Sequence, residues 1–154
     1  MSYLRRGRLG DQADAPGAGA APAVSLHDPG AQRVLRLFTG SPGLTRAMHA
    51  VGAAVPGSRH GNNSEMLAAL EDVVDQSREV SAQVRLVHCQ TKDGRAGQQL
   101  ALHALALAEQ AGCYLRAGLS TSDPDKTKAD LSQGATLSKA SLDAGAQAVK
   151  LLSK

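Results

Sequence analysis

The chain has 154 residues, which is enough for one domain with a modest hydrophobic core. It contains no Trp, one Phe and two Tyr, so Ala, Leu, Val, Ser and Gly must fill the interior, and this composition favours closely packed helices over β-sheets. Two cysteines do not form a disulfide framework in a chain of this length, and no apolar run reaches the roughly 18–20 residues that cross a bilayer. These features predict an all-α protein in the reducing cytoplasm, without a membrane span.

Positive charge is concentrated at the N-terminal end of the chain. The formal net charge is +3, to which residues 1–60 contribute +4 and residues 61–154 contribute −1. The first 24 residues combine Arg5, Arg6 and Arg8 with a stretch rich in Ala, Gly and Pro that has too little apolar area to fold alone. They also lack the apolar segment of a secretory signal. We therefore expect an extended basic arm over residues 1–24 and a single helical-bundle domain over residues 25–154.

Two short helices are expected to follow the arm. Asp28 is suited to cap the first helix, Pro29 to occupy its first position and Gly40 to end it, which predicts a helix over residues 29–39. The second helix repeats this pattern after Ser41 and ends at the next Pro-Gly pair. A polar loop comes next.

Three long helices are expected in the rest of the chain, at residues 64–92, at residues 96–117 and from residue 124 to the C-terminus. An Asp-Gly pair at 93–94 separates the first two, and an Asp-Pro pair at 123–124 begins the third. Because the connections are only a few residues long, neighbouring helices must run antiparallel. The sequence therefore predicts an antiparallel bundle of three long helices, in which the two short helices either supply a fourth wall end to end or project to reach a partner.

Two apolar stripes with alternating spacings of four and three residues support this bundle. The first stripe comprises Met66, Leu70, Val73, Ser77, Val80, Val84 and Val87. The second comprises Leu131, Ala135, Ser138, Leu142, Gly145, Val149 and Leu152. Small side chains in the second stripe let another helix approach closely. They predict either ordinary packing inside the bundle or a docking surface for another chain, formed by Ala135, Ser138, Leu142, Gly145 and Val149.

The sequence predicts no metal, cofactor or catalytic site. His88, Cys89, His103 and Cys113 are the candidate metal ligands, but a hairpin between the first two long helices places the two cysteines about 19 Å apart along the axis, so the four side chains cannot share one ion. His88 and His103 can be neighbours in this hairpin, with Cys89 on its outer face. The Glu-x-x-His motif of di-iron bundles does not occur.

We expect a non-enzymatic α-helical subunit with a structural or interaction role in a larger protein assembly, or one that self-associates. The alternative is a basic accessory protein of a ribonucleoprotein or virion, which contacts nucleic acid through Arg5, Arg6 and Arg8 together with Arg33 and Arg36. The chain lacks an aromatic platform for base stacking, so such binding would be weak and directed at the phosphate backbone. A bundle-class metal or cofactor enzyme is a third interpretation, which metal analysis would decide.

Overall fold

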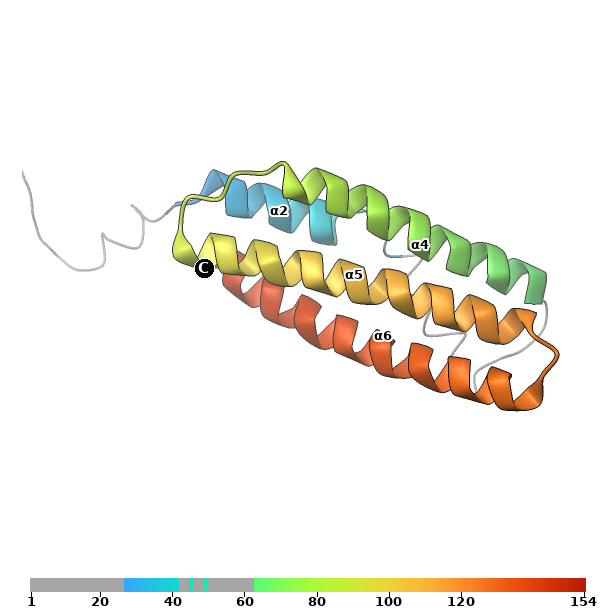
Figure 1. Cartoon of the computed structure of the whole chain (residues 1–154). Helices are drawn as coiled ribbons and strands as arrows, with labels where there is room; N and C mark the ends of the chain where they lie inside the picture. Colours follow the sequence, from blue (N-terminus) through green and yellow to red (C-terminus); the bar gives the residue numbers. More distant parts are fainter. Residues whose placement is uncertain (1–26, 42–44, 46–48, 50–62) are drawn as a thin grey trace, which may run out of the picture.

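The computed structural model describes residues 27–41, 45, 49 and 63–154, and the regular structure within these ranges is helical. Three long helices run side by side and antiparallel, and a short helix packs against all three at one end (Figure 1). The predicted all-α fold is confirmed. The predicted arm lies outside the described residues, as does the second short helix apart from Thr45 and His49, which are helical. The described helices are α2 (Pro29–Thr39), α4 (Asn63–Arg85), α5 (Lys92–Ser120) and α6 (Pro124–Leu152).

Capping signals in the sequence set the starts of α2 and α6. The Asp28 carboxylate accepts a hydrogen bond from Ala31 N at 3.2 Å, and Pro29 occupies the first position of α2. Asp123 and Pro124 begin α6 in the same way. The predicted first short helix and the predicted start of the last helix are therefore confirmed. Not one of the described helices is long and apolar enough to cross a membrane.

The break between α4 and α5 lies earlier in the chain than the sequence predicted. α4 ends at Arg85 and not at Lys92, and residues 86–91 form an irregular link. Asp93 and Gly94, the expected break, lie in the first turn of α5. As a result α5 has 29 residues and is longer than predicted, and we call the end of the bundle that carries residues 86–91 the link end.

Contacts between elements produce this early break. Gln98 of α5 donates hydrogen bonds to the backbone oxygens of Val84 and Val87, both at 2.8 Å, and so satisfies carbonyl groups where α4 ends. The Thr91 hydroxyl caps α5 by accepting a hydrogen bond from Gly94 N at 2.9 Å. The Asp-Gly pair then falls in the first helical turn, where an acidic side chain is favourable and does not interrupt the helix.

Small side chains let α5 and α6 pack closely along their length. A Cβ atom at Gly134 would lie 2.5 Å from Cγ of Leu115, so a larger residue there would force the helices apart. The Ser141 hydroxyl donates a hydrogen bond to Ala104 O on α5 at 2.8 Å. One row of buried residues in α5 recurs at alternating spacings of four and three, and all but Leu115 are small: Gly97, Ala101, Ala104, Ala108, Ala111, Leu115 and Gly118. We call the buried row of α6 the small-residue seam: Leu131, Gly134, Ser138, Ser141, Gly145, Ala148 and Leu152.

α4 contributes larger side chains to the core than α6 does. The first predicted stripe is confirmed as a core face, because its five central residues are buried: Leu70, Val73, Ser77, Val80 and Val84. α2 adds the fully buried Val34 at the link end. Oγ of Ser77 is buried without a hydrogen-bond partner among the described residues. The buried residues that α4 contributes are therefore mainly apolar, with Ser77 and Ser81 as the polar exceptions.

Candidate interaction surface on α6

The structure divides the second predicted stripe between two sides of α6. Ser138 and Gly145 belong to the small-residue seam. The Ser138 hydroxyl donates a hydrogen bond to Gly134 O at 2.8 Å, and Gly145 lies beside Phe38 and Ala104. Two of the five residues predicted to bind a partner are thus buried inside the bundle.

The other three residues lie on a side of α6 that stays open. Leu142 is 61% exposed, and Ala135 and Val149 are half-buried. Because they are spaced seven apart they line up along the helix, and the exposed Ala146 lies between two of them. We call Ala135, Leu142, Ala146 and Val149 the open stripe. Side-chain size explains why the predicted stripe is split between a buried and an open side. α5 approaches α6 on the side where α6 carries Gly, Ser and Ala.

A groove of about 360 Å³ borders the open stripe. Side chains of α2, α5 and α6 line it together with Thr45 and His49; the apolar ones include Phe38, Leu105, Ala108, Leu142 and Val149. Because these walls are mainly apolar and Leu142 is exposed beside them, the groove is suited to take an apolar side chain of another molecule.

Two residues of opposite charge lie beside Leu142, on the same side of it. Lys139 and Asp143 are both exposed, and neither forms an ion pair with another described residue. At about 100° per residue, both lie on the side of Leu142 that faces away from the small-residue seam. Lys139 and Asp143 therefore form a charged margin along one side of the apolar open stripe.

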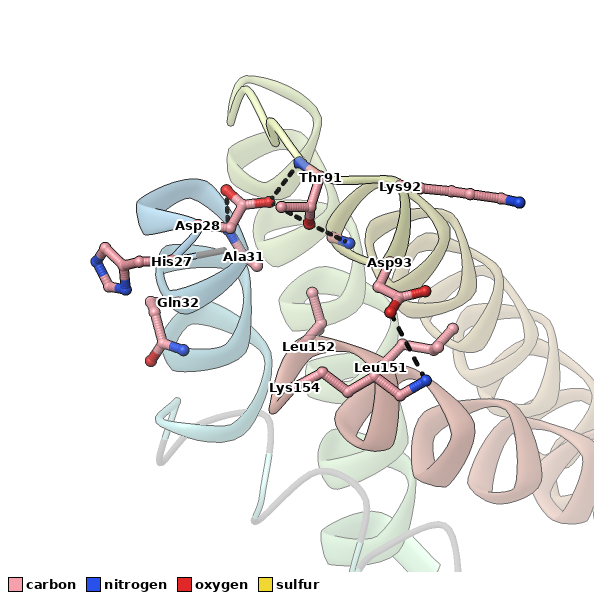
Figure 2. Close-up of a pocket in the computed structure, with 11 residues that line it drawn as sticks. His27, Asp28, Ala31, Gln32, Thr91, Lys92, Asp93, Leu151, Leu152 and Lys154 are labelled. Carbon is pink, nitrogen blue, oxygen red and sulfur yellow. Dashed lines mark hydrogen bonds and ion pairs between the residues drawn. The ribbon is translucent and has the colours of Figure 1, made fainter. Parts of the chain in front are cut away.

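A second cavity, of about 610 Å³, lies at the link end (Figure 2). Its buried charged group is Asp28, which is only 6% exposed. One carboxylate oxygen accepts a hydrogen bond from Ala31 N, and the other accepts from Gln90 N at 3.1 Å, Thr91 N at 2.9 Å and the Thr91 hydroxyl at 2.8 Å. This carboxylate ties α2 to the link and to the cap of α5, so its hydrogen-bonding capacity is used within the chain.

The environment of Asp28 keeps it charged. Burial raises the pKa of the carboxyl, but the hydrogen bonds from Thr91, Gln90 and Ala31 together outweigh burial and hold the pKa well below the ordinary range of an aspartate. The Asp93–Lys154 ion pair at this cavity is 3.6 Å long and half-exposed, so it adds little stability. We interpret the cavity as a structural junction.

The residues considered as metal ligands do not gather at one point. Cys89 is buried in the link, which corrects the expected outer position, and burial raises the pKa of its thiol. Cys113, His88 and His103 are exposed. In the part of the chain that the structure describes, no group of three or more His, Cys, Asp or Glu side chains could hold a metal ion. Cys89 is buried because the link after α4 is drawn against α2 by Asp28.

The described part of the predicted basic surface lies on α2. Arg33 and Arg36 are both exposed there, whereas Arg5, Arg6 and Arg8 lie outside the described residues. The two arginines are one helical turn apart, and neither forms an ion pair with another described residue, so they present positive charge to solvent.

Charge is divided along the bundle axis. The half nearest the link has seven Lys and Arg against three Asp, a net charge of +4 over residues 27–41, 80–106 and 141–154. The other half has five Lys and Arg against nine Asp and Glu, a net charge of −4 over residues 63–79 and 107–140. The exposed arginines of α2 therefore lie in the basic half.

Comparison with known proteins does not assign a role to these surfaces. No protein-family model, curated protein or solved structure matches this chain. The open stripe and its groove are therefore interpreted from their own geometry.

Sequence reasoning missed two residues of this surface. Ala146 lies four residues after Leu142, so helical spacing alone was a signal that could have identified it. The place of Phe38 in the groove depends on how α2 packs against α6, for which the sequence has no local signal.

Proposed function

We propose that this protein is a non-enzymatic α-helical interaction subunit that docks a protein partner along the open stripe of α6. Leu142 is the observation that carries this proposal, because a leucine that is 61% exposed borders a mainly apolar groove that is lined by α2, α5 and α6 together with Thr45 and His49. A cytoplasmic role within a larger assembly, as expected from the sequence, forms part of this proposal.

The surroundings of the groove favour docking of an apolar side chain. Phe38 is accommodated beside α6 because Gly145 has no side chain: a Cβ atom there would lie 3.3 Å from Cζ of the ring. The groove walls belong to packed helices, so little conformational entropy is lost when a partner binds. Burial of Leu142 by a partner would contribute on the order of 2 kcal/mol.

The test compares two exposed leucines. Tagged full-length protein is isolated from its source cells under mild conditions as the wild type, as Leu142→Asp and as Leu86→Asp. Leu86 is the matched control, since it is 87% exposed and lies in the link, away from the groove. We expect a stoichiometric protein complex with the wild type and with Leu86→Asp, and its loss with Leu142→Asp. A complex that both variants retain, or no complex with the wild type, would contradict the proposal.

A second candidate function is contact with the nucleic-acid backbone, which the net charge of +4 in the half around α2 favours. We expect weak binding of RNA or DNA that falls steeply with added salt and falls further in the Arg33→Glu/Arg36→Glu variant. Fluorescence anisotropy of labelled oligonucleotides measures this. Binding that is unaffected by the double variant, or that stays tight at about 200 mM salt, would reject this mode of contact.

A further inference from the structure

The charged margin of the open stripe is complementary to itself. Lys139 and Asp143 are four residues apart on one side of Leu142, and both are exposed. When two copies of a helix pair antiparallel about a two-fold axis at residue 141, the positions 139 and 143 of the two copies face each other. Each Lys139 then lies opposite Asp143 of the other copy, which gives two identical ion pairs from one surface.

The apolar row fits the same arrangement. In this alignment the two Leu142 side chains lie within about 3 Å of each other along the axis, so they meet across the centre of the contact. The exposed Ala146 leaves room beside them for the opposing helix to approach. Residues 130–152 of the two helices would overlap, a length of about 33 Å.

We propose that a second copy of this chain docks antiparallel on the open stripe of α6, with Leu142 of each copy at the centre and Lys139 of each opposite Asp143 of the other. The charge pattern selects a second copy over an unrelated partner, because a two-fold contact requires that one surface match itself, and this surface does. This inference rests on the proposed function in using the same surface, and it names the partner.

Charge reversal tests the proposed pairing. Sedimentation velocity of the purified full-length chain measures the dimer dissociation constant of the wild type, Lys139→Asp and Asp143→Lys. In each single variant two like-charged pairs replace two ion pairs, so we expect dimerisation to weaken about tenfold or more. Both positions are exposed, and circular dichroism checks that the helices are retained.

Mixing the variants makes the test specific to this geometry. In a mixed dimer of Lys139→Asp with Asp143→Lys, two ion pairs are again possible, one with the wild-type polarity and one with reversed polarity, so we expect affinity close to that of the wild type. The double variant Lys139→Asp/Asp143→Lys should likewise regain self-association.

The remaining variants separate this inference from the proposed function. Leu142→Asp should abolish dimerisation, and Leu86→Asp should leave it unchanged. A wild type that stays monomeric, or single and mixed variants that dimerise equally, would overturn the pairing proposed here. If Leu142→Asp still removed a different protein from the native complex, the proposed function would stand and only the identity of the partner would be wrong.

Discussion

α6 presents two rows of side chains that differ in size and in what they contact. The small-residue seam faces α5 and contains Gly134, Ser138 and Gly145, whereas the open stripe carries Leu142 and Val149 and lies outside that interface. Gly and Ser in the middle of the seam let α5 approach closely, and the larger Leu131 and Leu152 lie towards its two ends. The middle of the buried row is therefore less apolar than the exposed row beside it.

The largest loss of stability is expected for a substitution in the small-residue seam. In Gly134→Leu the new side chain would enter the space of Leu115, since a Cβ atom alone would lie 2.5 Å from Cγ of that leucine. We expect the free energy of unfolding to fall by about 3 kcal/mol. Urea denaturation followed by circular dichroism measures it. Thr136→Leu, on the exposed side of the same helix, is the control and should change stability by less than about 0.5 kcal/mol. Equal effects at the two positions would mean that α5 and α6 are not in close contact.

The buried carboxylate of Asp28 is expected to contribute more to stability than the exposed helix cap Asp123. Asp28→Ala removes a buried carboxylate that accepts four hydrogen bonds, and we expect a loss of about 2 kcal/mol. Asp123→Ala is the matched control, because Asp123 also caps a helix but is exposed, and it should cost about 1 kcal/mol or less. Urea titrations of the two variants measure the difference. Similar losses would show that Asp28 acts only as a helix cap.

The pH dependence of stability tests the charge of Asp28 directly. Its pKa in the folded protein lies below the unfolded value, so its contribution is present at neutral pH and is lost as the pH falls below about 4, where the unfolded chain takes up the proton first. Urea midpoints measured from pH 7 to pH 2 should therefore fall more steeply for the wild type than for Asp28→Ala. Parallel curves would be evidence against the lowered pKa.

The two interfaces of α5 differ in whether a buried serine hydroxyl has a hydrogen-bond partner. The hydroxyl of Ser141 in the seam donates to Ala104 O, whereas Oγ of Ser77 on α4 is buried without a hydrogen-bond partner among the described residues. Ser77→Ala should raise the free energy of unfolding by about 1 kcal/mol, because it removes an unsatisfied polar group. Ser141→Ala should lower it by about 1 kcal/mol. Thermal melts of both variants measure the signs, and a loss of stability in Ser77→Ala would show that its hydroxyl has a partner in solution.

The smallest expected effect on folding is at Leu142. Because this side chain is 61% exposed, Leu142→Ala should change the free energy of unfolding of the monomer by less than about 0.5 kcal/mol. The same substitution should weaken association measured by sedimentation. Val149→Ala, at a half-buried position, should cost more in monomer stability. A large loss in Leu142→Ala at low protein concentration would place this leucine inside the core of the monomer.

Local signals were sufficient for much of the fold. Aspartate followed by proline placed the starts of α2 and α6, and the four-three spacing of Leu70, Val73 and Val80 identified the buried face of α4. The end of α4 could not be predicted in this way. It depends on Gln98 and on the contact between Asp28 and the link, and these residues come together only in the folded chain.

The candidate surface on α6, too, could be predicted from the sequence only in part. Composition and periodicity selected α6 as the helix able to accept a close neighbour, and the sequence named Leu142 and Val149 among the residues concerned. It could not separate them from Ser138 and Gly145, because a heptad stripe is about as wide as the contact between two helices.

Helix caps and apolar periodicity act over a few residues, so the amino-acid pattern was sufficient to predict helices in the described part of the chain, the starts of α2 and α6 and the buried face of α4. The side of α6 that meets α5, the end of α4 and the link that Asp28 makes between three elements follow from the folded arrangement. These features depend on residues far apart in the chain, and the size and hydrogen-bonding capacity of the opposing side chains select between alternatives that the local pattern leaves equal.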